Sequence, residues 1–222
     1  SNAVKKYYIK NYFKLKKNKL KVIYYGVDKE YINKLKSNKK LKKIPNKDII
    51  FGAVGRLVRQ KNFELIIESY KRFTQKTKKT SCLVIAGKGP EEAKLKKFAK
   101  KINIDDKIVW MGHVNNIGNI FQKIHVFCMN SRFEGLGLVM LEAMSFFKPI
   151  IATIISAIPE VVINMQNGIL VNQYDVENYS NAMFKLSYKK FRNKLSRKSK
   201  TILHKKFNFD IMINKTHELY LN

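Results

Sequence analysis

The stretch Ile49-Ile50-Phe51-Gly52-Ala53-Val54, followed directly by Gly55, decides the fold. Six consecutive residues without a charged or strongly polar side chain predict a strand buried on both faces, as strands of parallel sheets are. Residues 62–73 follow, with apolar side chains at helical spacing. Strand, glycine turn and helix in this order predict the first unit of an α/β domain.

The same unit recurs along the chain. Repeated strand-helix units predict a doubly wound parallel sheet with right-handed crossovers, a Rossmann-like fold. Ligands of such sheets bind beyond the carboxyl ends of the strands. The expected strands are 49–54, 82–86, 107–111, 126–129, 149–153 and 169–171, and the expected helices are 62–73, one opened by Pro90, 117–122, 138–147 and the chain after Asp175. The residues that follow these strands are Arg56, Gly87, His113, Ser131 and Ala157.

The composition indicates a globular protein. A chain of 222 residues with 45% hydrophobic content is long enough to bury one core. Cys82 and Cys128 lie in apolar runs without zinc-ligand spacing, so we expect buried, reduced thiols in a cytosolic protein. No apolar run approaches the roughly 20 residues that span a bilayer, and no signal peptide is found.

The net charge of +29 suggests an anionic partner. The excess is almost all lysine, spread along the whole chain, without the arginine forks and interleaved aromatics of nucleic-acid sites. We therefore expect no nucleic-acid partner. A general lysine bias of the chain and a peripheral contact with an anionic membrane both remain open.

The segment 131–144 (SRFEGLGLVMLEAM) sets two carboxylates, Glu134 and Glu142, around a Gly-x-Gly turn that opens an apolar helix. Gly135 and Gly137 allow the backbone to approach a ligand, and the first amides of the helix form a site for an anion such as a diphosphate. Glu142 can accept hydrogen bonds from a ribose diol, and Glu134 can do the same for a hexose. An ordinary helix with two solvated glutamates is the alternative.

Arg56 and Lys61 supply the cations for such a site. Both follow the buried strand 49–54, and fixed cations stabilise the charge that develops on a departing diphosphate.

Three segments in this order, 55–62 (GRLVRQKN), 86–90 (AGKGP) and 131–144, resemble the nucleotide-sugar-binding half of retaining glycosyltransferases of the glycogen-synthase and sucrose-synthase type. The resemblance covers about Val22 to Ala182. It implies the C-terminal half of a GT-B architecture, and a domain that binds the donor of a hexosyl transfer to a polysaccharide or glycolipid.

The resemblance also implies the site. Arg56 and Lys61 would hold the diphosphate, Glu142 the ribose and Glu134 the sugar. We expect no metal and no cofactor beyond the nucleotide sugar, with a UDP-sugar favoured over a GDP-sugar. The implied catalytic residues are Glu134, Arg56 and Lys61, and the donor-binding residues are Gly55, Arg56, Lys61, His113, Val114, Ser131, Glu134, Gly135, Gly137, Leu138 and Glu142.

Other polar residues are weaker candidates. His113 lies in a stretch whose backbone lies beside the nucleobase in the family. We therefore expect that its side chain does not act as a general base. His125, His204 and His217 lack ligand spacing, and residues 105–106 (DD) indicate a turn.

The sequence departs from the family pattern in two places near the sugar. Phe147 and Ser156 stand where the family often has glycine. Lost glycines restrict the backbone there and put the choice of donor in doubt.

We divide the chain into four parts: residues left from an expression tag (1–3), the end of a preceding domain with the interdomain crossover (4–28), the Rossmann-like domain (29–206), and a C-terminal helix that packs back across the cleft (207–222). Residues 34–43 are expected to form a solvated loop.

The family has a second Rossmann-like domain before this one, so we expect half of an enzyme, inactive alone. A catalytically silent binding subunit and a nucleotide-sugar epimerase remain alternatives. The expected location is the cytoplasm, including the inner face of the cell membrane.

Overall fold

The protein forms a six-stranded, wholly parallel sheet in the order β3-β2-β1-β4-β5-β6. The computed structural model describes residues 1–12, 19–36 and 43–221. The doubly wound α/β fold predicted from the sequence is confirmed, and each strand lies within one residue of its expected bounds. The strands are β1 (Ile49–Val54), β2 (Ser81–Ala86), β3 (Ile108–Gly112), β4 (Val126–Met129), β5 (Ile150–Thr153) and β6 (Gly168–Val171).

The central strand β1 serves two hydrophobic cores, one on each face of the sheet. Ile49 and Phe51 face one core and Ile50 faces the other, and all three are buried. Both faces are apolar because both are covered, which explains the unbroken hydrophobic run. Gly52 leaves room for Ile124, whose Cδ1 would lie 2.6 Å from an added Cβ.

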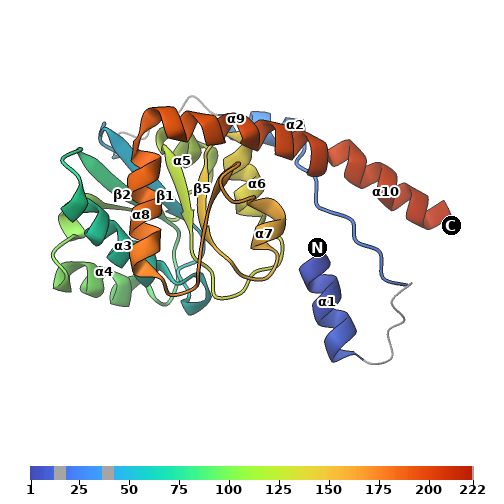
Figure 1. The fold of residues 1–222 in the computed structure, drawn as a ribbon, viewed down its shortest axis with the longest axis horizontal. Helices are drawn as coiled ribbons and strands as arrows, with labels where there is room; N and C mark the ends of the chain where they lie inside the picture. The colour runs from blue at the N-terminus through green and yellow to red at the C-terminus, as the bar shows by residue number, and fades with distance from the viewer. Residues whose placement is uncertain (13–18, 37–42, 222) are drawn as a thin grey trace.

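Helices cover the two faces of the sheet in separate layers (Figure 1). Apolar residues at helical spacing bury one side of each long helix. The first face carries α3 (Phe63–Lys76), α4 (Glu92–Lys101) and α8 (Val176–Ser187), and the second carries α2 (Lys29–Leu35), α5 (Gly118–Lys123), α6 (Leu138–Ser145) and α7 (Ile158–Val161). Helix α9 (Lys189–Lys206) runs along one edge of the sheet and contributes Leu195 to the first core and Leu203 to the second.

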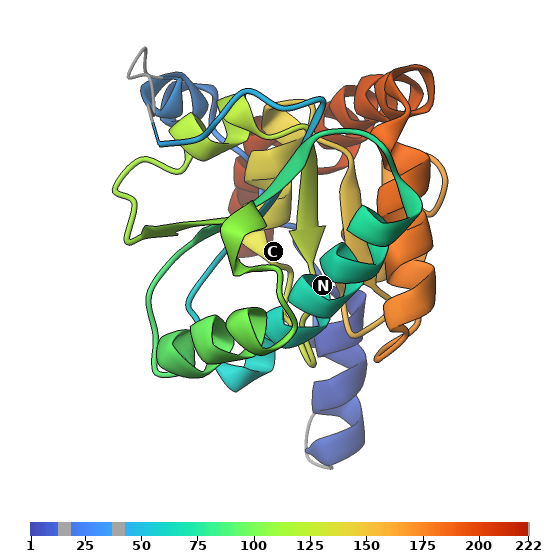
Figure 2. The same ribbon diagram turned by 90° about the vertical axis from the view of Figure 1, so that its left-hand side faces the viewer.

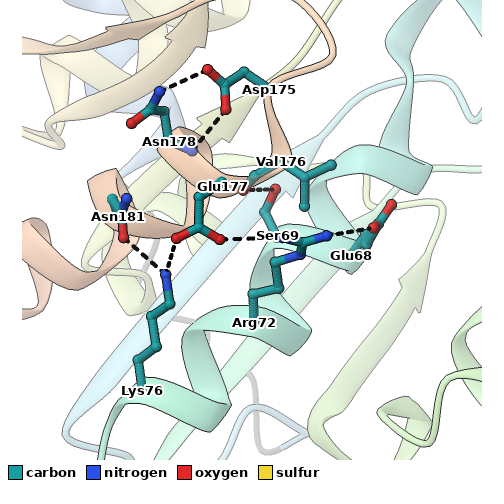
Figure 3. Close-up of polar contacts among 9 residues, drawn as sticks. All are labelled: Glu68, Ser69, Arg72, Lys76, Asp175, Val176, Glu177, Asn178 and Asn181. Atoms are coloured by element: carbon teal, nitrogen blue, oxygen red, sulfur yellow. Dashed lines mark hydrogen bonds and ion pairs between the residues drawn. The ribbon is translucent and has the colours of Figure 1, made fainter.

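Polar contacts fix α8 against α3 (Figure 3). Asp175 caps α8 by accepting a hydrogen bond from the Asn178 amide at 2.9 Å. Glu177, in the first turn, pairs with Lys76 and with Arg72 Nη1, the latter at 3.2 Å. These exposed pairs add little stability each, so the apolar face of α3 holds the two helices together.

The segment before α2, which is predicted from the sequence to be an interdomain crossover, meets the joint between α9 and α10 (Phe209–Leu221). The Val27 amide donates to the Phe207 carbonyl at 2.9 Å, and Val27 pairs with Asn208. An added Cβ on Gly26 would lie 2.4 Å from the Asn208 oxygen, so this close approach requires glycine. The crossover and the C-terminal segment are thus joined at one point.

Two terminal helices extend from the body of the domain. Neither α1 (Asn2–Asn11) nor α10 has a buried residue; Figure 1 shows both projecting outward, and Figure 2 shows α1 extending from the domain. The expected packing of residues 207–222 across a cleft stays a prediction.

Three local expectations need correction or completion. Residues 34–43 are not simply a solvated loop. Leu35 ends α2 and is buried, and the Lys43 ammonium donates a hydrogen bond to the Trp110 carbonyl at 2.6 Å. Residues 37–42 lie outside the described part of the chain. The helix predicted over 138–147 ends at Ser145, because Phe147 adopts a left-handed conformation with φ of 56°. Cys82 and Cys128 are free and buried, as expected.

Candidate functional site

The candidate site lies where the strand order reverses, between β1 and β4. This switch point leaves a crevice at the carboxyl edge of a doubly wound sheet. Two loops meet there, one after β1 and one after β4. The Arg132 amide donates to the Gln60 carbonyl at 2.7 Å, and Gln60 Nε2 donates to the Phe133 carbonyl at 2.9 Å. Topology and hydrogen bonds together bring residues 55–62 beside residues 131–137.

A lysine and a glutamate from these two loops pair across the crevice. Lys61 Nζ contacts Glu134 Oε2, and the two side chains are 22% and 13% exposed. Ser131 Oγ donates to the same carboxylate oxygen at 3.2 Å. The sequence assigned Lys61 to a diphosphate and Glu134 to a sugar, and the pair places these two functions in contact. A ligand that uses both groups has its anion and its hydroxyls next to each other.

Arg56 provides a second cation at the same edge. Arg56 is exposed, and no carboxylate in the described part of the chain forms an ion pair with it. An exposed guanidinium without an ion pair is available to an anion from solvent.

The turn before α6 has the geometry that the Gly-x-Gly pattern predicts. Gly137 has φ of 73°, a left-handed conformation that favours glycine, and an added Cβ would also meet the flexible end of Met140, its Cε, at 2.8 Å. Helix α6 starts at Leu138 without a side-chain cap, which leaves the first amides free for an anion. Gly135 differs, because an added Cβ would meet nothing within 4 Å.

Glu142 is held by a partner that the sequence did not indicate. Tyr31 donates its hydroxyl hydrogen to Glu142 Oε1 at 2.6 Å. Burial raises the pKa of the Glu142 carboxyl, and the bond from Tyr31 opposes that rise. The same bond, followed by burial, raises the pKa of Tyr31 to about 12. The hydrogen bond lowers the pKa of Glu142 and raises that of Tyr31, so it keeps the proton on the phenol and favours Glu142 as the acceptor.

The signal for Tyr31 was weak but present. Asp28 caps α2 and accepts from the Glu30 amide at 2.9 Å, and Ile32 and Leu35 stand at helical spacing. Together they would have predicted a helix that carries Tyr31. No sequence pattern would have shown that this helix faces α6.

His113 and Val114 follow β3, as expected for residues beside a base. His113 is exposed, and Val114 packs partly buried against the second core. The structure places both at the carboxyl edge. No hydrogen bond involving a side chain joins them to Glu142 or Lys61 among the described residues.

His125 has a structural role instead. Its Nδ1 accepts a hydrogen bond from the Ile50 amide at 2.9 Å. Burial, followed by the charges of Arg192 and Lys148, lowers the pKa of His125 to about 4. The side chain is therefore a neutral acceptor that completes the start of β1.

Among the cavities of the described residues, one lies away from the switch point and another lies beside it. One of about 410 Å³ lies at the far end of α6, where Ser145, Phe147 and Phe207 are among its lining residues. A second, of about 270 Å³, lies next to the switch point and includes Arg59, Asn62 and Arg132 in its wall. We place the site at the switch point rather than in the cavity at the far end of α6, because the paired charges and the free helix amides are at the switch point.

The described residues hold neither a cluster of metal ligands nor a helix that could span a membrane. No group of three or more His, Cys, Asp or Glu side chains converges as a set of metal ligands. None of the helices in the described part is both long and apolar enough to cross a bilayer. The expectation of metal-free binding stays a prediction.

Two residues adopt left-handed backbone conformations where glycine was expected from the resemblance. Phe147 has φ of 56° and Ser156 has φ of 47°. Both residues thus adopt a conformation that favours glycine, at a cost in conformational strain. The expectation that Phe147 lies near the sugar is wrong, because Phe147 lines the cavity at the far end of α6, away from the switch point.

The chain matches known proteins along most of its length. A family model described as glycosyl transferases group 1 matches residues 33–201. The chain is 30% identical over 210 residues to the Escherichia coli UDP-Gal:α-D-GlcNAc-diphosphoundecaprenol α-1,3-galactosyltransferase, covering 92% of this chain and 54% of that protein. It is 24% identical to the capsular polysaccharide biosynthesis glycosyltransferase CapM of Staphylococcus aureus, covering 92% of this chain and 56% of CapM. The chain thus spans about half the length of these relatives.

Solved structures share the fold. Anabaena HepE in complex with UDP and glucose superposes with a TM-score of 0.82 at 18% identity, covering 99% of this chain and 61% of HepE. A glycosyltransferase from Rickettsia africae superposes with a TM-score of 0.83 at 19% identity, again covering 99% and 61%.

Proposed function

Because the chain belongs to the group 1 glycosyltransferases, we propose that its switch-point crevice binds the nucleotide-sugar donor of a retaining, metal-independent hexosyl transfer. The observation that carries the proposal is the meeting of Lys61, Glu134 and the uncapped start of α6 at one edge of the sheet. These groups offer a cation, a hydroxyl acceptor and free amides within a single crevice.

Each residue has one task in this proposal. Arg56, Lys61 and the amides near Gly137 and Leu138 hold the diphosphate. As the glycosidic bond breaks, negative charge builds on the departing diphosphate, and these fixed donors lower the barrier. Glu142 accepts from the ribose and Glu134 from the sugar. Glu134 pairs with Lys61 in the structure, so a donor that uses both groups must exchange this ion pair for ligand contacts.

Relatives suggest the donor and the acceptor. The Escherichia coli relative is named for UDP-galactose and a diphosphoundecaprenol acceptor, and the Staphylococcus aureus relative for capsular polysaccharide. We therefore favour a UDP-sugar over a GDP-sugar, and a glycolipid or polysaccharide acceptor.

A peripheral contact with an anionic membrane is part of the proposal. Helix α9 supports it, because nine of its 18 residues are Lys or Arg and none is acidic. Such a surface attracts anionic lipid, and this attraction weakens with salt.

The two glutamates give the sharpest test of the assignment. Glu142→Ala should weaken UDP binding by about 1–3 kcal/mol, the usual value for a hydrogen bond to a charged group. Glu134→Ala should leave UDP affinity unchanged or slightly improved, because Lys61 loses its competing partner. Glu68→Ala, an exposed glutamate on α3, is the matched control. Calorimetric titration measures all three, and equal losses in the two site variants would show that their roles are wrongly assigned.

The proposed transfer also needs groups that hold the acceptor and close the crevice to water. We expect the 222-residue chain to bind the donor without transferring sugar. A product assay with a UDP-sugar tests this, and turnover of about 1 per second or more would place the whole catalytic machinery within these residues.

A further inference from the structure

Tyr31 is held rigidly although its own side chain is 44% exposed. Its helix α2 is capped by Asp28, and Ile32 and Leu35 bury against the second core. The end of α2 also packs directly on the start of α5: an added Cβ on Gly118 would lie 2.1 Å from the Leu35 oxygen. The phenol therefore extends from a fixed helix rather than from a loop.

The contact of Tyr31 uses one of the two oxygens of Glu142. The hydroxyl donates to Oε1 at 2.6 Å. Among the residues that the structure describes, none is recorded as donating to Oε2. A carboxylate held by one oxygen has a fixed side-chain orientation and keeps the lone pairs of the other oxygen for a ligand.

We propose that Tyr31 is a positioning residue that orients Glu142 toward the ribose and thereby sets the preference of the site for ribonucleotides over deoxyribonucleotides. This inference rests on the proposed function, since it requires Glu142 to face the ribose. Tyr31 itself need not touch the nucleotide. Its effect should depend on the ribose hydroxyls, whereas a purely structural role would affect all nucleotides equally.

The experiment compares UDP with 2′-deoxy-UDP and 3′-deoxy-UDP by calorimetry, or the guanosine equivalents if UDP does not bind. The native chain should bind UDP about tenfold more tightly than the weaker deoxy analogue, the ratio expected for one hydrogen bond to a charged group. Tyr31→Phe removes one hydroxyl group. The substitution should weaken UDP binding about three- to tenfold. It should leave the affinity for the weaker-binding deoxy analogue nearly unchanged, and so reduce the preference for UDP over that analogue.

Three further variants make the result unambiguous. Tyr25→Phe is the matched control, since Tyr25 is an exposed tyrosine of the same segment, and it should bind UDP as the native chain does. Glu142→Ala should remove the discrimination, and Tyr31→Phe combined with Glu142→Ala should behave like Glu142→Ala alone. Thermal unfolding should show that each variant remains folded.

The outcomes separate this inference from the proposed function. If Glu142→Ala leaves UDP affinity unchanged, the ribose assignment itself fails. If Glu142→Ala weakens UDP but Tyr31→Phe does not, or weakens UDP and both analogues equally, only the role of Tyr31 is refuted. Tighter UDP binding by Tyr31→Phe would also refute it, because Tyr31 would then compete with the ribose.

Discussion

Lowering the pH from 7.5 to 5.0 should destabilise the domain through one half-buried histidine, His125. His125 accepts a hydrogen bond from the Ile50 amide through Nδ1 and must be neutral to do so. Its pKa is lowered to about 4, first by burial and then by the charges of Arg192 and Lys148. The unfolded chain has an ordinary histidine pKa, so below about pH 6.5 it binds more protons than the folded chain. The contribution to stability is therefore complete above that pH and is lost as the pH falls toward 4.

The two pKa values fix the magnitude. The difference between 6.5 and about 4, at about 1.36 kcal/mol for each pKa unit, limits the loss to about 3 kcal/mol below pH 4. At pH 5.0 about 2 kcal/mol of that loss should have accumulated. Ending at pH 5.0 keeps the carboxylates with lowered pKa, such as Glu177, largely ionised.

Urea denaturation at the two pH values is the assay. His125→Asn retains a side-chain acceptor close to the position of Nδ1 but cannot titrate. Its free energy of unfolding should fall between pH 7.5 and 5.0 by about 2 kcal/mol less than that of the native chain. His217→Asn, on an exposed part of α10, should keep the native pH dependence. Equal losses in the native chain and in His125→Asn would refute the reasoning.

Two further predictions concern backbone positions near the site. Gly87→Ala should destabilise the domain by more than about 2 kcal/mol and weaken nucleotide binding, because the new Cβ would lie 1.9 Å from the Gly55 oxygen. Gly135→Ala is the control, because an added Cβ there would meet nothing within 4 Å. Equal stability losses in the two variants would contradict the packing argument. Ser156→Gly should stabilise the domain by about 1 kcal/mol by relieving a left-handed residue, whereas Ala157→Gly, at φ of −87°, should destabilise it. Thermal unfolding measures both pairs, and a destabilised Ser156→Gly would mean that the serine side chain outweighs its backbone strain.

The sequence predicted the sheet well because most of its strands are buried on both faces. A run such as 49–54 fits only a strand that is covered on both faces of an α/β sheet, and a glycine turn marks its end. The proximity of Lys61 and Glu134 was predictable for a related reason: both follow strands whose carboxyl ends meet at one edge of the sheet.

What the sequence did not predict depends on long-range contacts between separate elements. The bond of Tyr31 to Glu142 joins residues 111 positions apart, and that of His125 to Ile50 joins residues 75 apart. Neither has a periodic signal, because each depends on how α2 or the loop before β4 packs on the finished sheet. The end of α6 at Ser145 was missed because phenylalanine rarely adopts the left-handed conformation found at Phe147.

The central claim, that the crevice between residues 55–61 and 131–142 binds a nucleoside diphosphate without metal, is tested most directly by one titration. UDP and GDP are added to the 222-residue chain in a calorimeter, in buffer with excess chelator, and the measurement is repeated with Arg56→Met. We expect saturable 1:1 binding of at least one nucleotide, and binding about tenfold or more weaker in the variant because a charged hydrogen bond to the diphosphate is lost. Binding that disappears with the chelator, or that is unchanged in Arg56→Met, would contradict the account.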